Sequence, residues 1–440
     1  MRIAVVGSGV SGLVAAWLLA REHEVVLYES ADRLGGHAHT NEVDFGNGSI
    51  AVDTGFIVFN HRTYPLFRRV LRELGVAEAD SDMSFSASIP ARGVEYNGTS
   101  LNTLFAQRRN LLRPSFWRMV RGILRFYKEA RELLEPGAEE ITLGDYLAKR
   151  GYAKEFVDDH LVPMAAAVWS TDRVRMMDFP ARFLVRFFDH HGFMEVDNRP
   201  PWFTVAGGSR EYVRAIERVL GTSVRLSDPV LSVRRESQAA QSQGVRVLSE
   251  RSDEYFDQVV LATHSDTALK LLDQPSAAER EVLGALPYQE NVAQLHSDTR
   301  VMPRKRKAWA SWNYHVGADA NAAPTITYWM NLLQGIESPE PLFVSLNRQA
   351  EIDPDKVHGR WIYHHPLYTA ATVAAQARRP EIQGVDRIWY TGAYWGYGFH
   401  EDGARSGVEV ARRLGVPFAE DLGEREIDRL LIPGATGVQA

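Results

Sequence analysis

A glycine-rich turn between two short apolar runs restricts the fold of this 440-residue chain more than any other feature. Residues 2–6 predict a buried strand, a turn with the spacing G-x-G-x-x-G follows, and residues 13–21 predict a helix. Residues 24–28 predict a second strand, which ends at Glu29. Strand, glycine turn, helix, strand and acid in this order are typical of a βαβ unit that binds a dinucleotide.

Each residue of this pattern has a physical role. Gly7 permits the tight turn, Gly9 lets the backbone approach a pyrophosphate, and Gly12 lets the helix pack closely on the strand. The free N–H groups at the helix N-terminus attract the phosphates. Glu29 is placed to accept hydrogen bonds from ribose hydroxyls. A plain glycine loop would leave the position of Glu29 unexplained.

Composition narrows the classes of function. The apolar share of 45% and the charged share of 24% indicate an ordinary globular enzyme, and the net charge of −6 disfavours nucleic acid as a partner. The absence of cysteine excludes disulfides and thiolate metal sites, and with no H-E-x-x-H pattern we predict no metal. Arg2 and the apolar run after it are also compatible with a signal peptide, but the regular glycine spacing favours nucleotide binding.

Further segments carry a resemblance to a known family. Arg33-Leu-Gly-Gly36, Asp53-Thr-Gly55 and the pair 388–392 and 403–407, together with the glycine turn, resemble the flavoprotein superfamily of amine oxidases, phytoene desaturases and protoporphyrinogen oxidase. The resemblance implies FAD as the cofactor. One departure is Ala393, which stands where many members carry an acid, so one hydrogen bond to FAD is expected to be missing or to come from elsewhere. The FAD-binding residues that the motifs and the resemblance imply are Gly7, Gly9, Val10, Ser11, Gly12, Glu29, Ser30, Arg33, Gly35, Gly36, His37, Thr54, Gly55, Phe56, Val230, Ala262, Thr263, Gly392, Gly403, Ala404 and Ser406.

The matching segments lie far apart in the chain, which predicts the domain organisation. The fold class is expected to be α/β, with a Rossmann-type, glutathione-reductase-like FAD-binding domain assembled from separated segments and an α+β substrate domain. The predicted FAD-binding domain comprises residues 1–75, 201–266 and 385–425. The intervening residues 76–200 and 267–384 form the predicted substrate domain, and residues 426–440 a tail.

The segment before the last predicted helix holds the candidate catalytic residues. Tyr394, Trp395, His400 and Glu401 are expected to lie near the flavin ring. The aromatic side chains of this segment either wall the flavin or, with His400 and Glu401, take part in the chemistry. A histidine has the right ordinary pKa to move a proton while the flavin accepts a hydride.

A narrower resemblance suggests a substrate. The run G-F-H-E-D-G at 398–403, with residues 311–315 and 328–331, resembles bacterial FAD oxidoreductases associated with cyclopropane-fatty-acid synthases, some of whose relatives act in furan fatty acid synthesis. The resemblance implies desaturation of a methyl-branched, unsaturated acyl chain of a membrane phospholipid. The product would be a conjugated diene on the way to a furan fatty acid. A lipid methyltransferase is an expected partner.

The segment 105–131 carries eight basic residues and one acid. Phe116, Val120, Ile123, Leu124 and Tyr127 recur at helical spacing. A basic amphipathic helix in an acidic protein indicates contact with an anionic membrane surface. This predicts a cytoplasmic protein, peripheral to the inner face of the membrane. The alternative is the solvated face of an ordinary helix.

Two other functions remain open from the sequence. The first is a soluble flavin amine oxidase acting on a small amine, with Tyr394 and Trp395 as an aromatic cage and the superfamily's lysine near the flavin sought at Lys305 or Lys307. The second is a non-catalytic partner of a lipid methyltransferase that uses FAD structurally. A long apolar tunnel beside residues 105–131 would favour the lipid, and a small polar-mouthed cage the amine.

Overall fold

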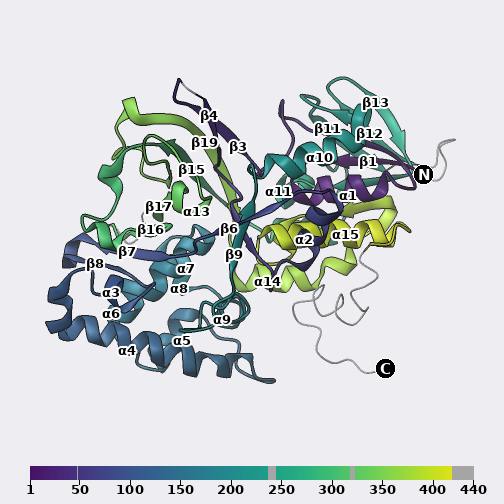
Figure 1. Cartoon of the computed structure of the whole chain (residues 1–440). Helices are drawn as coiled ribbons and strands as arrows, with labels where there is room; N and C mark the ends of the chain where they lie inside the picture. The colour runs from purple at the N-terminus through teal and green to yellow at the C-terminus, as the bar shows by residue number, and fades with distance from the viewer. Residues whose placement is uncertain (47, 236–243, 318–322, 419–440) are drawn as a thin grey trace.

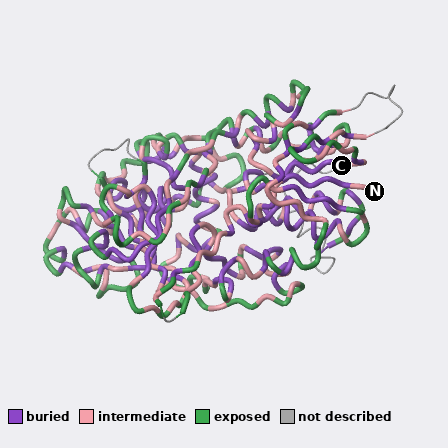
Figure 2. The backbone as a smooth tube through the Cα atoms, turned by 90° about the horizontal axis from the view of Figure 1, so that it is seen from above, coloured by how far each residue is buried: buried purple, intermediate pink, exposed green. Residues whose placement is uncertain are grey.

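The computed structural model describes residues 1–46, 48–235, 244–317 and 323–418. Two lobes lie side by side, joined at a three-stranded sheet of β5, β9 and β6 (Figure 1). Figure 2 shows buried backbone in both halves of the elongated molecule. The predicted tail at 426–440 lies outside the described residues. The three joining strands are β5 (Val58–Asn60), β9 (Trp202–Val205) and β6 (Glu78–Ser81).

The first lobe is built on a five-stranded sheet of order β10-β2-β1-β14-β20, in which every pairing is parallel. The strands come from distant parts of the chain, which confirms the expected α/β class with a sheet assembled from separated segments. The predicted domain limits stay a prediction. These strands are β1 (Arg2–Val6), β2 (Glu24–Tyr28), β10 (Val224–Arg225), β14 (Gln258–Leu261) and β20 (Ile388–Tyr390).

Layers cover both faces of this sheet. On one face lie α1 (Val10–Leu19), α2 (Pro65–Glu73), α10 (Arg210–Leu220) and α15 (His400–Arg413). On the other lie the antiparallel strands β11 (Val230–Arg235), β12 (Val245–Ser249) and β13 (Asp253–Phe256), with α11 (Ser265–Leu271) and α12 (Ala277–Gly284). A hairpin of β3 (Thr40–Asp44) and β4 (Ser49–Asp53) extends from this lobe.

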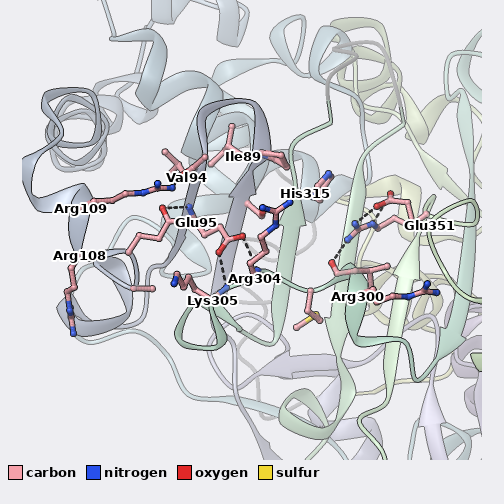
Figure 3. Close-up of a pocket in the computed structure, with 18 residues that line it drawn as sticks. Ile89, Val94, Glu95, Arg108, Arg109, Arg300, Arg304, Lys305, His315 and Glu351 are labelled. Atoms are coloured by element: carbon pink, nitrogen blue, oxygen red, sulfur yellow. Dashed lines mark hydrogen bonds and ion pairs between the residues drawn. The ribbon is translucent and has the colours of Figure 1, made fainter.

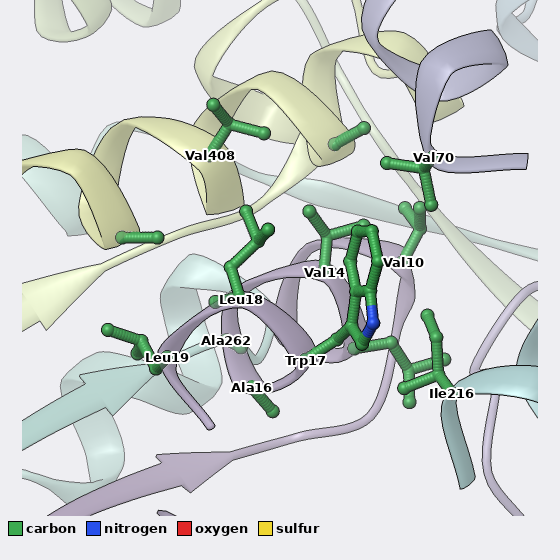
Figure 4. Close-up of a cluster of buried hydrophobic side chains, with 14 of the residues drawn as sticks. Val10, Val14, Ala16, Trp17, Leu18, Leu19, Val70, Ile216, Ala262 and Val408 are labelled. Atoms are coloured by element: carbon green, nitrogen blue, oxygen red, sulfur yellow. The ribbon is translucent and has the colours of Figure 1, made fainter. Parts of the chain in front are cut away.

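Helix α1 is apolar on every side because the sheet and α15 enclose it. All ten of its residues are buried, and Val14, Trp17 and Leu18 belong to the same buried hydrophobic cluster as Val408 of α15 (Figure 4). The two helices approach closely at Gly407, where an added Cβ would meet the Ser11 carbonyl oxygen. Close packing of this kind fixes the N-terminus of α1 relative to that of α15.

The second lobe contains a seven-stranded, mostly antiparallel sheet. Its order is β19 (Val357–Pro366), β15 (Tyr288–His296), β18 (Phe343–Leu346), β17 (Thr325–Trp329), β16 (Trp312–His315), β7 (Phe85–Ile89) and β8 (Val94–Asn97). Its helices are α3 (Leu101–Leu104), α4 (Pro114–Glu129), α5 (Leu143–Lys149), α6 (Lys154–Phe156), α7 (Val162–Trp169), α8 (Arg173–Met177), α9 (Ala181–His190) and α13 (Met330–Leu333). Helix α14 (Ala370–Ala377) packs instead against α12 of the first lobe. Among the helices of the described residues, none has the length and apolar character needed to cross a membrane.

The apolar face of α4 is turned toward the protein. Phe116, Met119 and Phe126 are buried in the core of the second lobe, so this face is not available to a bilayer. Most of the apolar stripe of α4 therefore packs against the lobe, and the contact of segment 105–131 with an anionic membrane surface stays a prediction. The exposed apolar side chains of this region are Leu101, Leu111, Leu112, Trp117 and Leu124.

Candidate active site

The glycine turn lies at the carboxyl ends of β1 and β14. Gly7 has a left-handed φ of +102°, and a Cβ on Gly12 would collide with the Gly7 carbonyl oxygen. A Cβ on Gly9, in contrast, would meet no atom within 4 Å. In the described structure α1 begins after Gly9 with no side-chain cap and no acid in its first turn. Unpaired N–H groups and open space at Gly9 are what a pyrophosphate requires.

Glu29 closes the turn from the end of β2. Its Oε2 accepts hydrogen bonds from the Ser8 backbone N–H at 2.9 Å and the Ser8 hydroxyl at 2.5 Å. Its Oε1 accepts bonds from Ser30 and from the Ala31 N–H. The carboxylate is therefore held beside the turn, half-buried, and its oxygens can accept further hydrogen bonds.

A second loop runs against the turn. Gly36, at φ +57°, lies against Gly9, and a Cβ on Gly55 would collide with the His37 carbonyl oxygen. The Arg33 guanidinium braces this loop by donating to the Gly36 carbonyl oxygen at 2.9 Å. The predicted segments around Gly35 and Thr54 are thus brought together with the glycine turn by backbone-to-backbone contact.

The C-terminal segment completes this cradle. The Ser406 hydroxyl accepts the Gly392 N–H at 2.9 Å and lies 2.6 Å from the Thr391 hydroxyl. A Cβ on Gly403 would meet Val10 of α1, and Ala404 is fully buried beside it. Ala262 and Thr263 follow β14 and border Gly7. Val230 is the buried first residue of β11. Two residues before it, the Asp228 N–H donates a hydrogen bond to the Glu29 carbonyl oxygen.

These residues fit FAD. They offer the unpaired amides of α1, the open space at Gly9, the acid at the end of β2 and close backbone approaches at four glycines. They would hold the ADP half of the cofactor, with the phosphates at α1 and the ribose at Glu29.

A cavity of about 160 Å³ lies between the two lobes, beside this cradle. In the described structure its lining contains no Lys, Arg, Asp or Glu. The lining residues are His37, Thr54, Gly55, Phe56, Ile57, Val58, Val168, Trp169, Ser170, Trp312, Tyr328, Leu346, Tyr363, His365, Pro366, Tyr368, Tyr397, Gly398, Phe399 and His400. Two polar atoms of this lining, the Trp312 indole N–H and the Tyr368 hydroxyl, are buried and have no hydrogen-bond partner among the described residues.

The three histidines of the lining are uncharged at neutral pH. Burial lowers the pKa of His37 well below its ordinary value, aided by the neighbouring His365. Burial lowers the pKa of His365 to about 4 and that of His400 to about 3. The cavity is therefore electrically neutral and walled mainly by aromatic and aliphatic side chains.

Of the four predicted catalytic residues, His400 is the one that lines this cavity. It opens α15, its ring stacks on Phe56 with centroids 3.5 Å apart, and its Nε2 lies 3.0 Å from the Tyr212 hydroxyl. The ring is thus fixed in place by one stacking contact and one hydrogen bond. Its catalytic role stays a prediction.

Glu401 points the other way, toward α2. Its two carboxylate oxygens accept the N–H groups of Leu66 and Phe67 at 3.0 Å and 2.9 Å, in the first turn of that helix. Burial raises the pKa of Glu401 to about 7. The geometry gives Glu401 a capping role, and its predicted part in proton transfer stays a prediction.

Tyr394 and Trp395 lie behind the cavity rather than on it. Both are buried in the cluster between the parallel sheet and the β11–β13 layer. Their rings pack on each other at 4.9 Å, and neither lines the interlobe cavity. Their predicted catalytic role, alone or as a cage, therefore has no contact with this cavity and stays a prediction.

Sequence reasoning missed the residues that the second lobe contributes. Trp169 lines the cavity and donates its indole N–H to the Tyr397 carbonyl oxygen at 3.1 Å. Tyr363 lies 2.8 Å from the Thr54 hydroxyl, and His365, two residues on along β19, shares its side of the strand. The available signal was the alternation along this strand, in which the exposed His364 separates Tyr363 from His365. Such an alternation does not reveal which face of the strand meets the other lobe.

The lysine sought near the flavin is not found at either suggested position. Lys305 lines a different cavity, and Lys307 is exposed in the turn that follows. Both positions are therefore corrected, because the connection between β15 and β16 runs along the outside of the second lobe.

Comparison with known proteins shows which family this chain belongs to. The family described as flavin containing amine oxidoreductase matches residues 10–340. A protein named as a flavin-containing monoamine oxidase, AofH of Mycobacterium tuberculosis, is 28% identical over 273 residues, which are 59% of this chain and 56% of that protein. The chain thus matches a little over half the length of this relative.

Solved structures share the fold across almost the whole chain. Cyclohexylamine oxidase from Brevibacterium oxydans is similar with a TM-score of 0.66 and 13% identity, over 94% of this chain and 98% of that one. The fatty acid isomerase from P. acnes that produces CLA is similar with a TM-score of 0.66 and 14% identity, over 94% and 99%. With the family match spanning most of its length, the chain belongs to the flavin-containing amine oxidoreductase family, and FAD is its cofactor.

Proposed function

We propose that this oxidoreductase desaturates a methyl-branched, unsaturated acyl chain of a membrane phospholipid, giving a conjugated diene on the way to a furan fatty acid. The observation that carries the proposal is the neutral interlobe cavity, whose lining holds no ionised side chain among the described residues. An acyl chain brings no charge of its own, so it loses little on entering such a cavity. A neighbour of the same fold is named as a fatty acid isomerase, which is compatible with this substrate class.

The reaction removes one hydride and one proton from the acyl chain and leaves a new carbon–carbon double bond. FAD, when bound, supplies the two-electron oxidant. Aromatic side chains such as Trp169 and Phe399 exclude water from the chain, and the His400 imidazole, which lines the cavity, is the group proposed to accept the proton. Tyr212 and Phe56 hold that ring in position.

A small, neutral amine is the second candidate. The named function of AofH and the cavity volume of about 160 Å³ favour it, because this volume suits a small molecule.

Anaerobic absorbance of the bound flavin distinguishes the lipid substrate from the amine substrate. Vesicles containing a methyl-branched, unsaturated phospholipid are expected to bleach the flavin, and a panel of amines is not. Bleaching by an amine alone would replace the lipid proposal with amine oxidation.

A histidine variant tests the site itself. His400→Gln is expected to slow anaerobic bleaching by roughly tenfold or more while FAD stays bound, since general acid–base groups contribute at least this much. His364→Gln is the matched control, because His364 is exposed on β19 next to the cavity residue His365. Equal rates for both variants would remove His400 from the mechanism.

We also propose that the enzyme works at an anionic membrane surface, on its cytoplasmic side, and that a lipid methyltransferase supplies its substrate. Exposed Leu111 and Leu112, 45% and 88% accessible, lie between basic residues of the segment that precedes α4. Replacing both leucines with serine is expected to lower binding to anionic vesicles, because each buried apolar side chain contributes about 1.5–3 kcal/mol. Val219→Ser, on the first lobe and 59% exposed, is the control. Sedimentation with vesicles measures the effect, and equal binding by both variants would speak against this surface.

A further inference from the structure

A second cavity, of about 790 Å³, lies in the second lobe and shares no lining residue with the interlobe cavity (Figure 3). It is bounded by the ends of β7 and β8, by the turn at Arg108–Leu112 and by the connection from β15 to β16. Along β16, Trp312 lines the interlobe cavity and His315 lines this one, three positions away. Residues an odd number apart on a strand point to opposite faces, so the two cavities are distinct sites.

The lining of this cavity is strongly basic. It holds six Arg and Lys side chains against two carboxylates, in a protein whose net charge is −6. Both carboxylates are already engaged. Glu95 accepts the backbone N–H groups of Arg304 and Lys305, each at 2.9 Å, and Glu351 pairs with Arg348 at 2.5 Å. The basic lining is thus only partly neutralised from within.

Three cations remain for a ligand. The side chains of Arg304 and Lys305 are exposed and make no ion pair or hydrogen bond in the described part of the chain. Arg109 extends toward the cavity and donates one hydrogen bond, to the Gly93 carbonyl oxygen at 2.5 Å. A carbonyl leaves its positive charge uncompensated.

The other cations of the lining are committed elsewhere. Arg300 is paired with Asp298, and Arg108 extends away from the cavity and bonds to Asn102. Glu95 acts instead to organise the site, because its contacts with two consecutive amides fix the turn that carries Arg304 and Lys305. Burial of the Glu95 carboxylate beneath the turn leaves the two side chains free to converge on an incoming anion.

From this arrangement we propose that the cavity binds a phosphate group, held by Arg109, Arg304 and Lys305. Arginine forms bidentate hydrogen bonds with phosphate, and lysine adds a point charge, so this set matches a phosphate ester better than a single carboxylate. The exposed Leu111 and Leu112 follow Arg109 by two and three residues in the turn Arg108–Leu112, so apolar side chains lie in the same turn as a cation of the cavity. This juxtaposition favours the headgroup of a phospholipid as the source of the phosphate.

The lipid source rests on the proposed function, whereas the phosphate chemistry rests on the cavity alone. Because the cavity faces away from the interlobe cavity, the bound headgroup belongs to a docking lipid and not to the acyl chain being oxidised. The site would hold the second lobe against the membrane surface.

The test compares two double variants of the FAD-loaded, full-length protein. Arg304→Gln with Lys305→Gln removes two cavity charges, and Arg121→Gln with Lys128→Gln removes two exposed charges from α4, outside the cavity. Binding is measured to phosphatidylcholine vesicles that contain phosphatidylglycerol, with glycerol 3-phosphate as a soluble competitor. The retained flavin absorbance shows that each variant is folded.

The affinity for vesicles is expected to fall by roughly tenfold or more in the cavity variant and by roughly threefold or less in the α4 variant. Glycerol 3-phosphate is expected to lower vesicle binding by the parent and by the α4 variant, but not by the cavity variant. Equal losses in both variants, or no loss in the cavity variant together with no binding of glycerol 3-phosphate to the parent, would overturn the phosphate site. Binding of glycerol 3-phosphate without any effect on vesicles would support the phosphate site and reject the lipid source. Flavin bleaching by detergent-dispersed lipid, measured in parallel, reports on the proposed reaction independently of docking.

Discussion

Replacing Gly12 with alanine is expected to give a protein that retains no FAD after purification and unfolds at a lower temperature than its parent. The new Cβ would collide with the Gly7 carbonyl oxygen and come within 2.9 Å of the Ala262 Cβ, and neither atom is the end of a flexible side chain. Overpacking of this kind costs about 1–3 kcal/mol or more. The displaced turn also loses the amide geometry that the phosphates need. Flavin absorbance of the purified protein and thermal unfolding of the apoprotein measure the two effects.

Gly9→Ala is the matched variant, because the same methyl group is added three residues earlier in open space. Its apoprotein is expected to unfold within about a degree of the parent apoprotein, since no atom lies within 4 Å of the new Cβ. FAD affinity is nevertheless expected to fall by roughly tenfold or more, which corresponds to about 1.4 kcal/mol, because the methyl group occupies the approach of the pyrophosphate. Normal FAD binding by this variant would show that the phosphates lie elsewhere.

The difference between these two glycines explains how much of the site the sequence could predict. The turn, Glu29 and the helix that follows are neighbours along the chain, so their spacing alone predicts their geometry. Gly36 and Gly55 were found because they belong to a family pattern, and the structure then brings their backbones together. The FAD cradle is therefore readable from local sequence and from resemblance.

The interlobe cavity, in contrast, could not be predicted from local sequence. Trp169, Tyr363 and Tyr368 come from α7, from β19 and from the loop after β19, which lie far from the glycine turn in the sequence. Each lies in a pattern that would serve equally well in an ordinary core, so no local signal distinguishes a cavity-lining aromatic side chain from a packed one. The α4 stripe shows the same ambiguity, because an apolar helical face suits a membrane and a protein core alike.

The start of α15 shows why two of the catalytic candidates, His400 and Glu401, point in different directions. Adjacent residues on a helix point about 100° apart, so His400 and Glu401 cannot share one environment. His400 faces the cavity and stacks on Phe56, whereas Glu401 faces the first turn of α2. The sequence placed both near the flavin but could not assign the direction of either side chain.

Glu401 is expected to make the stability of the protein depend on pH. Burial raises its pKa from 4.5 to about 7, so the folded protein binds a proton more tightly than the unfolded chain does. The stability associated with this proton is fully present below about pH 4.5 and is lost as the pH rises through about 7. A pKa difference of this size corresponds to about 3 kcal/mol of unfolding free energy.

Glu401→Gln cannot ionise, so it is expected to lack this pH dependence. Its glutamine oxygen accepts one amide of α2 and its NH₂ group faces the other, which makes the variant less stable than the parent at low pH. As the pH rises from about 4 to about 8, the deficit is expected to shrink by about 3 kcal/mol, because only the parent must ionise a buried carboxyl group. Denaturant unfolding with flavin release as the probe measures this difference at each pH.

Glu217→Gln, which removes an exposed carboxylate from α10, serves as the control, and its difference in stability from the parent should be the same at every pH. A deficit of Glu401→Gln that stays the same at every pH would mean that the carboxylate between α15 and α2 is ionised throughout, stabilised by the two α2 amides and by Arg405.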